Sequence, residues 1–259
     1  MKISIFTSMT DPEKRMDPWE EALNCYESFA DEVVIVGDEW EQEFKWGDVN
    51  KILQRGFKES TGDWVIWMDI DNFFHEKDFD YIKNFLSENC DKPAVAFPKY
   101  QIFTPDRFHI KSVICRALNK KNFNNILLNG GGDMCLPTLN NNLIDPNTSP
   151  VSKAAIWNYD TVFKTKKIIA DDRARFARGW FREFGNYGDR GGGTPEEAYS
   201  AWFEMVSNRY KEHKHPLKLN DHPKFIKNKL ETLKISQFGY EGFGLKQDNF
   251  MLRMRRLFS

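Results

Sequence analysis

Short apolar runs alternate with helix-like stretches along the first part of the chain. A strand is expected at residues 2–8, where apolar and polar residues alternate, and at 31–38 and 64–68, which are rich in β-branched and aromatic residues. Apolar positions recur at helical spacing over 17–30 and 47–59. This strand–helix order predicts a parallel, right-handed crossover unit.

The two expected helices have clear starts and inward faces. Asp17-Pro18-Trp19-Glu20 offers a capping acid, a proline at the first helical position and a glutamate at the third. Gly47-Asp48 opens the second helix. The inward faces are expected to carry Ala22, Cys25, Tyr26 and Phe29 in the first helix, and Val49, Ile52, Leu53, Gly56 and Phe57 in the second.

The pattern becomes less regular after the third strand. A helix is expected at about 78–90 and a strand at 94–103. Residues 119–150 carry nine Asn around Gly130-Gly-Gly-Asp133, which predicts a long irregular segment. It is interpreted either as an active-site or acceptor loop or as an Asn-rich surface loop.

Two further elements are expected near the end. A strand is expected over 156–163, and Thr194-Pro195-Glu196-Glu197 is a second capping signature, which starts a helix to about residue 211. The glycine run 191–193 before it is interpreted as a hinge or an anion-accepting turn.

The clearest candidate chemistry follows the third strand. Asp69 and Asp71 come directly after the apolar run Trp64 to Met68. Ligands of open α/β sheets bind beyond the carboxyl ends of the strands. Two carboxylates there suit Mg²⁺ or Mn²⁺ that also bridges substrate phosphates. The alternative is a chance Asp-x-Asp, because Asp often ends a strand at a turn.

Composition narrows the partners. The 259 residues carry a net charge of −1 with a pI near 6.5, so a nucleic-acid partner is not expected. Cys25, Cys90, Cys115 and Cys135 lack zinc spacing and are interpreted as reduced thiols of a cytoplasmic protein. No signal peptide or membrane span is expected. The basic, apolar tail 250–258 is a candidate helix that packs on the body or lies on a membrane surface.

Residues 46–75, from Trp46-Gly-Asp-Val-Asn to Trp64-Val-Ile-Trp-Met-Asp-Ile-Asp, resemble the nucleotide-binding half of GT-A glycosyltransferases, closest to the family 2 type. The resemblance covers about 110 residues. It implies a GT-A-like α/β/α sandwich with a mostly parallel sheet and a Rossmann-like nucleotide-binding half. One continuous domain is expected, with a nucleotide-sugar half at 1–110 and an acceptor half at 111–259.

The same resemblance implies an activity and its partners. A sugar would move from a nucleoside diphosphate sugar to a hydroxyl acceptor, carbohydrate or other, in glycan or polysaccharide biosynthesis. Mn²⁺ or Mg²⁺ would neutralise the diphosphate. It further implies that the base of the nucleotide lies near Thr7 and Asp38 and that Lys51 or Arg55 lies near the nucleotide. The metal would bind Asp71, and Asp69 would point toward the ribose or the metal.

Some family features are absent. Gly37-Asp38-Glu39-Trp40 replaces the usual Asp-Asp-Gly-Ser, and the usual Ala-Arg-Asn of the next helix is not clearly present, with Asn50 the nearest candidate. A histidine completes the metal shell in some relatives, and here His222 or His75 is the candidate.

An inverting transferase needs a base for the acceptor hydroxyl. In the family this is an acid about a hundred residues beyond the Asp-x-Asp motif, which here falls on Asp171 and Asp172. They follow an Ile-Ile-Ala run interpreted as a strand end. Glu183 and Asp133 are the rivals.

Three other interpretations compete. A phosphatase of the haloacid dehalogenase type also begins from Asp-x-Asp, but it wants Thr or Val where Phe73 stands and a place near the N-terminus. A sugar nucleotidyltransferase needs a Gly-rich loop that residues 8–15 lack. A non-catalytic sugar- or nucleotide-binding module stays open.

Overall fold

A computed structural model of the chain describes residues 1–38, 41, 43, 45–130 and 135–233. Its central sheet consists of β1 (Ile3–Ser8), β2 (Glu32–Val36), β3 (Trp64–Trp67), β4 (Asn72–Phe73), β5 (Ala94–Thr104), β6 (Arg107–Asn119), β10 (Ile156–Asn158) and β11 (His215–Pro216). A small second sheet consists of β7 (Leu127–Gly130), β8 (Leu136–Leu139) and β9 (Asn142–Leu143). The helices are α1 (Trp19–Phe29), α2 (Trp46–Glu59), α3 (Phe79–Glu88), α4 (Lys166–Phe184), α5 (Pro195–Tyr210) and α6 (Lys224–Glu231).

The central sheet has the order β2-β1-β3-β6-β5-β10-β4, with β11 paired to β6. β1 lies parallel to both β2 and β3, and β10 lies parallel to β5. Only β6 and β4 run against the common direction among the described strands. The mostly parallel α/β fold is therefore confirmed.

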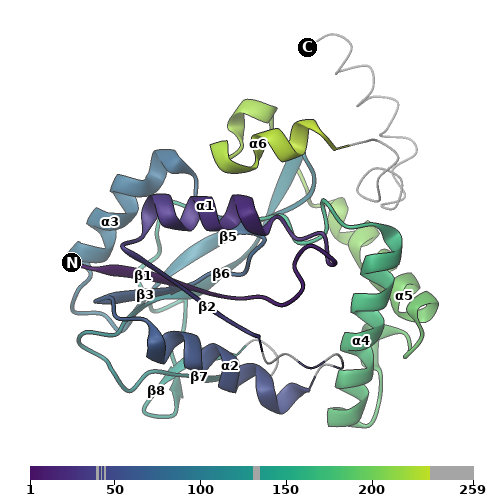
Figure 1. Ribbon diagram of the computed structural model, residues 1–259, viewed down its shortest axis with the longest axis horizontal. Helices are drawn as coiled ribbons and strands as arrows, with labels where there is room; N and C mark the ends of the chain where they lie inside the picture. The colour runs from purple at the N-terminus through teal and green to yellow at the C-terminus, as the bar shows by residue number, and fades with distance from the viewer. Residues whose placement is uncertain (39–40, 42, 44, 131–134, 234–259) are drawn as a thin grey trace.

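Helices cover both faces of this sheet (Figure 1). α1, α3 and α6 pack on one face, where the buried apolar cluster includes Tyr26, Ile82 and Ile226. α2 covers the other face together with the small β7–β9 sheet. A side chain at Gly56 would collide with the ring of Phe6, so this glycine lets α2 approach β1 closely.

The expected crossover unit is confirmed, including the buried faces of both helices. The capping role of Asp17 is wrong. α1 begins after Pro18 without a side-chain cap, and the Asp17 carboxylate instead forms ion pairs with Arg15 at 3.0 Å and with Lys164 at 2.8 Å. Two buried or half-buried cations compete successfully for a carboxylate that would otherwise cap a helix.

The second half departs further from expectation. β6 was not predicted, and the segment 119–150, expected to be irregular, contains the short strands β7–β9. The Ile-Ile-Ala run is not a strand end, because it lies in the first turns of α4. The second capping signature is confirmed: the Thr194 hydroxyl accepts the Glu197 N–H, and the Glu197 carboxylate accepts the Thr194 N–H. Positions 131–134 and the tail 250–258 lie outside the described residues.

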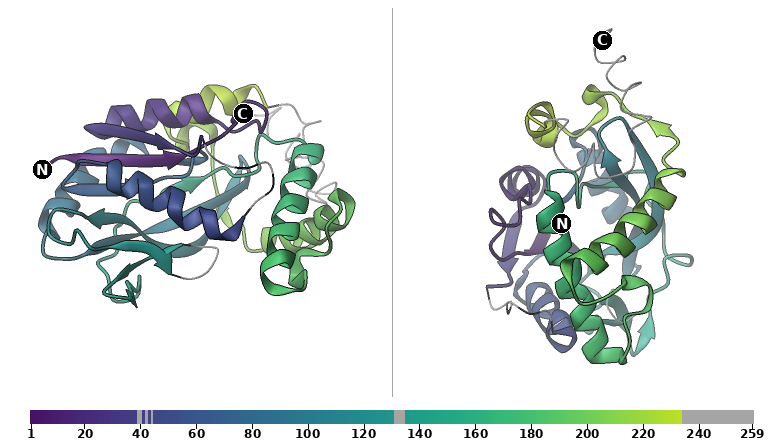
Figure 2. Two further views of the ribbon diagram at one scale, coloured as in Figure 1. Left: turned by 60° about the horizontal axis from the view of Figure 1, so that its bottom comes forward. Right: turned by 90° about the vertical axis from the view of Figure 1, so that its right-hand side faces the viewer.

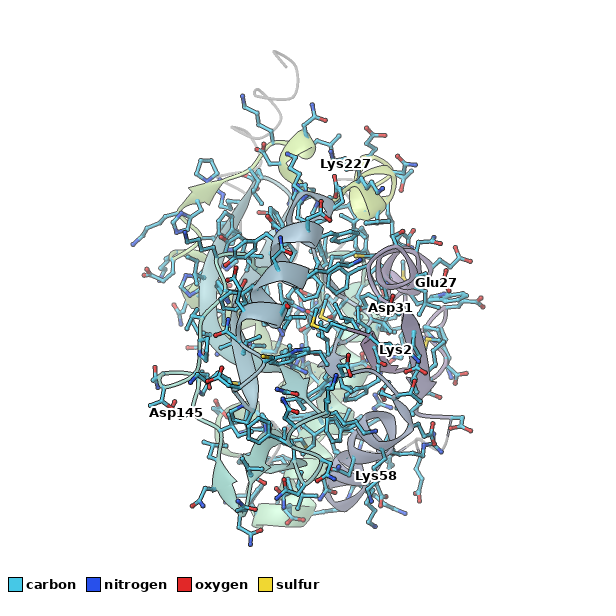
Figure 3. The ribbon with its side chains drawn as sticks, turned by 90° about the vertical axis from the view of Figure 1, so that its left-hand side faces the viewer. Lys2, Glu27, Asp31, Lys58, Asp145 and Lys227 are labelled. Carbon is cyan, nitrogen blue, oxygen red and sulfur yellow. The ribbon has the colours of Figure 1, made fainter. Side chains whose placement is uncertain are left out.

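α4 and α5 stand beyond the carboxyl ends of β1 and β3, at the right of Figure 1, and both views of Figure 2 agree on this. Figure 3 looks onto the opposite end, where Lys2 and Asp31 lie side by side. There the Asp31 carboxylate accepts the Ile3 N–H at 2.8 Å, and Asp63 accepts the Lys2 N–H at 2.8 Å. These hydrogen bonds satisfy the Lys2 and Ile3 N–H groups at that end. The candidate site lies at the α4 end of the sheet.

Candidate functional site

A cavity of about 230 Å³ lies where the carboxyl ends of β1 and β3 face α4. Its position is the one where open α/β sheets bind ligands. Five acidic and three positively charged residues line it together with four other residues. The lining is Ser8, Met9, Thr10, Arg15, Asp17, Glu41, Asp69, Ile70, Asp71, Asp160, Lys164 and Arg175.

The Asp69–Asn72 turn is fixed from two sides. From α1, the Tyr26 hydroxyl lies 2.7 Å from the Asp69 carbonyl and 2.9 Å from the Asn72 carbonyl. From β10, Asn158 donates to the Asp71 carboxylate at 3.0 Å and to the Asn72 side chain at 3.0 Å. The two acids thus have defined positions before any ligand binds.

Asp71 and Asp160 share one cavity but titrate in opposite directions. Burial raises the pKa of Asp71 to about 7, and the charges of Asp160 and Asp69 add to that rise. Burial also opposes ionisation of Asp160, but Arg173, Lys164 and further cations outweigh it and hold its pKa below the usual range. Asp71 is therefore the carboxylate that an added cation would relieve most.

A network of ion pairs joins the turn before α1 to α4. Arg15 lies 3.1 Å from Asp172, and Lys164 lies 3.9 Å from Asp160 and 3.8 Å from Asp172. The Lys164 side chain is only 5 % exposed. These two cations line the same cavity as Asp69 and Asp71, so the cavity offers both signs of charge to a ligand.

A second cavity of about 240 Å³ adjoins the first along α4. Four bases and two acids line it, and none of its lining comes from β1, β2 or β3. The lining is Arg15, Asp160, Thr161, Lys164, Ile169, Asp172, Arg173, Arg175 and Phe176.

Asp69 and Asp71 suit one kind of divalent-ion site, in which the substrate supplies further ligands. Within the described residues, no group of three His, Cys, Asp or Glu side chains could hold a metal. Asp69 and Asp71 nevertheless fit an ion held by one or two carboxylates together with substrate phosphates, as Mg²⁺ often is. Asp69 already pairs with a cation, Arg116, at 3.3 Å, whereas the donor to the Asp71 carboxylate is the neutral Asn158 at 3.0 Å, so Asp71 is the better ligand.

The structure does not bring His222 or His75 into this set. His222 is buried, with one ring nitrogen 2.8 Å from the Tyr159 hydroxyl and the other 2.7 Å from the Pro105 carbonyl. Both nitrogens of His222 are engaged in these hydrogen bonds, and His222 lines neither cavity of the cleft. His75 accepts the Lys77 N–H and packs on Trp157.

The residues expected near the nucleotide separate into two groups. Thr7 is buried and precedes Ser8, the first residue of the chain that lines the first cavity. The Thr7 hydroxyl has no hydrogen-bond partner among the described residues. Asp38 is 84 % exposed and pairs with Arg55 at 2.7 Å. Lys51 and Arg55 line a separate groove of about 620 Å³ between α2 and β7.

The candidate bases also separate. Asp172 lines the second cavity but is paired with Arg15, Lys164 and Arg175. Asp171 and Glu183 are exposed on α4 and line neither cavity. Asp133 lies outside the described residues.

Sequence reasoning missed residues that the fold brings to the cleft. Asp160 lies inside the stretch 156–163 that was expected to be one strand, but β10 ends at Asn158 and leaves Asp160 just beyond its carboxyl end. No local pattern marks the others, because they come from elements far apart in the chain. They are Arg15, Arg116, Asn158, Lys164 and Arg175.

No family model and no curated protein matches the sequence. Among solved structures, a glycosyltransferase involved in glycosylation of the major capsid of PBCV-1 matches at 14 % identity and a TM-score of 0.32. That match covers 46 % of this chain and 60 % of the other. S. aureus TarS 1-349 matches at 11 % identity and a TM-score of 0.37, over 94 % of this chain and 89 % of the other. TarS 1-349 in complex with UDP-GlcNAc matches at 10 % identity and a TM-score of 0.32, over 94 % and 88 %.

These matched chains are glycosyltransferases or bind UDP-GlcNAc by their own descriptions. At TM-scores this low the likeness decides nothing about this chain's activity, which rests on its own residues. In the described part of the chain, no helix has the length and apolar character needed to cross a bilayer.

Proposed function

We propose that this protein is a metal-dependent glycosyltransferase that moves a sugar from a nucleoside diphosphate sugar to an acceptor hydroxyl in glycan or polysaccharide biosynthesis. The observation that carries the proposal is the cavity at the carboxyl ends of β1 and β3, which Asp69, Asp71, Arg15 and Lys164 line together. The sequence resemblance of residues 46–75 to GT-A transferases supports the same activity.

In this proposal residues 1–110 bind the donor. Thr7 precedes Ser8, which lines the first cavity, and its buried hydroxyl has no hydrogen-bond partner among the described residues, so it stays a candidate for a donor contact. Asp71, with Asp69 beside it, would hold Mn²⁺ or Mg²⁺, which when bound neutralises charge on the departing diphosphate. Arg15 and Lys164 line the same cavity and would stabilise the same charge.

Residues from 111 onward supply the acceptor side. We propose Asp160 as the acceptor-activating base in place of Asp171 or Asp172. Asp160 lines both cavities, its side chain is 41 % exposed, and Arg173 orients it at 3.1 Å. Cations hold its pKa below the usual range, so the carboxylate is ionised at neutral pH. Asp172 remains the rival because it lines the second cavity.

Calorimetry with UDP and GDP, each with and without Mn²⁺, tests this function. Wild-type protein should bind at least one of the two much more tightly with the metal. Asp71→Asn should lose the metal-dependent part, whereas the matched control Asp80→Asn, exposed on α3, should keep it. Metal-independent binding by wild type, or equal metal dependence in Asp71→Asn, would contradict the proposal.

A further inference from the structure

The second cavity differs from the first in the charge it presents. Its four bases come from the turn before α1 and from the β10–α4 segment, and only two acids face them. Lys99 and Lys111 add further positive charge near Asp160. A cavity with an excess of cations inside a protein favours an anionic occupant.

The hydroxyl of Thr161 gives an independent observation. Thr161 lines this cavity and is only 2 % exposed, yet its Oγ1 has no hydrogen-bond partner among the described residues. Buried hydroxyls are normally paired, because leaving one unpaired costs free energy. An oxyanion in the cavity would accept this hydrogen bond and satisfy the orphaned group.

We propose that the second cavity binds an anionic group, a phosphate or a carboxylate, carried by the acceptor. The assignment to the acceptor rests on the proposed transferase function. The anion is not the donor diphosphate, because none of β1, β2 and β3 lines this cavity while Asp69 and Asp71 line the other. Asp160 lines both cavities. An acceptor whose anionic group binds in the second cavity would therefore present its hydroxyl near Asp160, where the two cavities meet.

Three variants separate this site from the donor site. Thr161→Val removes only the hydroxyl and leaves every ion pair in place. Arg173→Gln removes a cation that lines the second cavity alone. Arg182→Gln is the control, because Arg182 is on the same helix, is exposed, pairs with Glu43 and lines neither cavity.

The experiment is calorimetry of inorganic phosphate, and separately of acetate, into protein that already holds saturating UDP and Mg²⁺. Phosphate should bind without displacing UDP. Thr161→Val and Arg173→Gln should each weaken it by about tenfold or more, since each removes a contact to a charged group. Arg182→Gln should bind as wild type does. Acetate binding of similar strength identifies a carboxylate as an accepted group, and phosphate binding alone identifies a phosphate-bearing acceptor.

Other outcomes overturn the proposal. One is that phosphate does not bind to the protein that holds UDP, and another is that it displaces UDP. A third is that Thr161→Val and Arg173→Gln both bind phosphate with wild-type affinity. Failure of the transferase function looks different. UDP would then not bind with Mg²⁺, while phosphate binding would still depend on Thr161 and Arg173.

Discussion

The two cavities of the cleft share Arg15, Asp160, Lys164 and Arg175 but differ in charge. The first adds Asp69 and other acids, whereas the second adds Arg173 and only one more acid. Like charge excludes like, so a divalent ion is drawn to the first cavity and kept out of the second. In the proposed transferase, the first cavity is the donor side and the second cavity, along α4, is the acceptor side.

Replacing the shared acid breaks this division most severely. Asp160→Asn should lower sugar transfer by about 10²–10⁴ because a general base is lost, while UDP affinity changes little. Release of UDP from a turned-over UDP-sugar, with and without acceptor, measures the loss. Asp171→Asn and Asp172→Asn are the comparison variants. If either of them loses transfer while Asp160→Asn keeps it, the base is the residue expected from sequence.

The pH dependence of donor binding sharpens the contrast between Asp71 and Asp160. Asp71, with a pKa of about 7, must lose its proton before it can hold a metal. Metal-dependent UDP affinity should therefore rise roughly tenfold per pH unit below about pH 7 and level off above it. Asp160 stays ionised over this range. A flat affinity across the range, measured by calorimetry, would show that Asp71 is not a ligand.

The same raised pKa makes a prediction about stability without metal. Folding raises the pKa of Asp71, so its contribution favours the fold below its unfolded pKa and is lost as the pH rises through about 7. Asp71→Asn should then raise the unfolding free energy at about pH 8 by up to about 4 kcal/mol and change it little at about pH 4. Thermal unfolding at both pH values, with Asp80→Asn beside it, checks this. Equal stability of Asp71→Asn and wild type at the higher pH contradicts it.

The smallest expected effect concerns how the Asp-x-Asp turn is held. Tyr26→Phe removes the hydroxyl that bridges the Asp69 and Asn72 carbonyls and should cost about 1 kcal/mol of stability. It should also weaken metal-dependent UDP binding a few-fold, because the turn loses its fixed position. Tyr210→Phe, which loses a buried contact to Thr104, is the control. It should lose stability only, and equal donor affinity in both variants would mean that Tyr26 is merely structural.

Sequence reasoning succeeded where information is local. The strands β1 to β3 and the helices α1 and α2 have apolar spacings that specify their type, and Asp69 and Asp71 follow a strand end directly. The wrong Asp17 cap shows the limit. Its true partners, Arg15 and Lys164, become visible only when α4 is placed against the turn before α1.

The acceptor side was hardest to predict for the same reason. The Ile-Ile-Ala run favours a strand by composition, but it forms one face of α4. Thr161 and Arg173 meet in one cavity only because β10 leads into that helix. His222 likewise bonds to Tyr159 and Pro105, which are far away in the sequence. The residue spacing around His222 therefore could not show that both its ring nitrogens are engaged.

The most direct measurement of the central claim is a titration of Mn²⁺ followed by the paramagnetic resonance signal of the free ion. With UDP present, wild-type protein and Asp80→Asn should each take up one Mn²⁺ tightly. Without UDP, uptake should be weak, because Asp69 and Asp71 lack the phosphate oxygens that complete the shell. Asp71→Asn should lose the tight uptake seen with UDP. Equal uptake with and without UDP, or tight uptake by Asp71→Asn, would contradict a nucleotide-bridging metal site in this cleft.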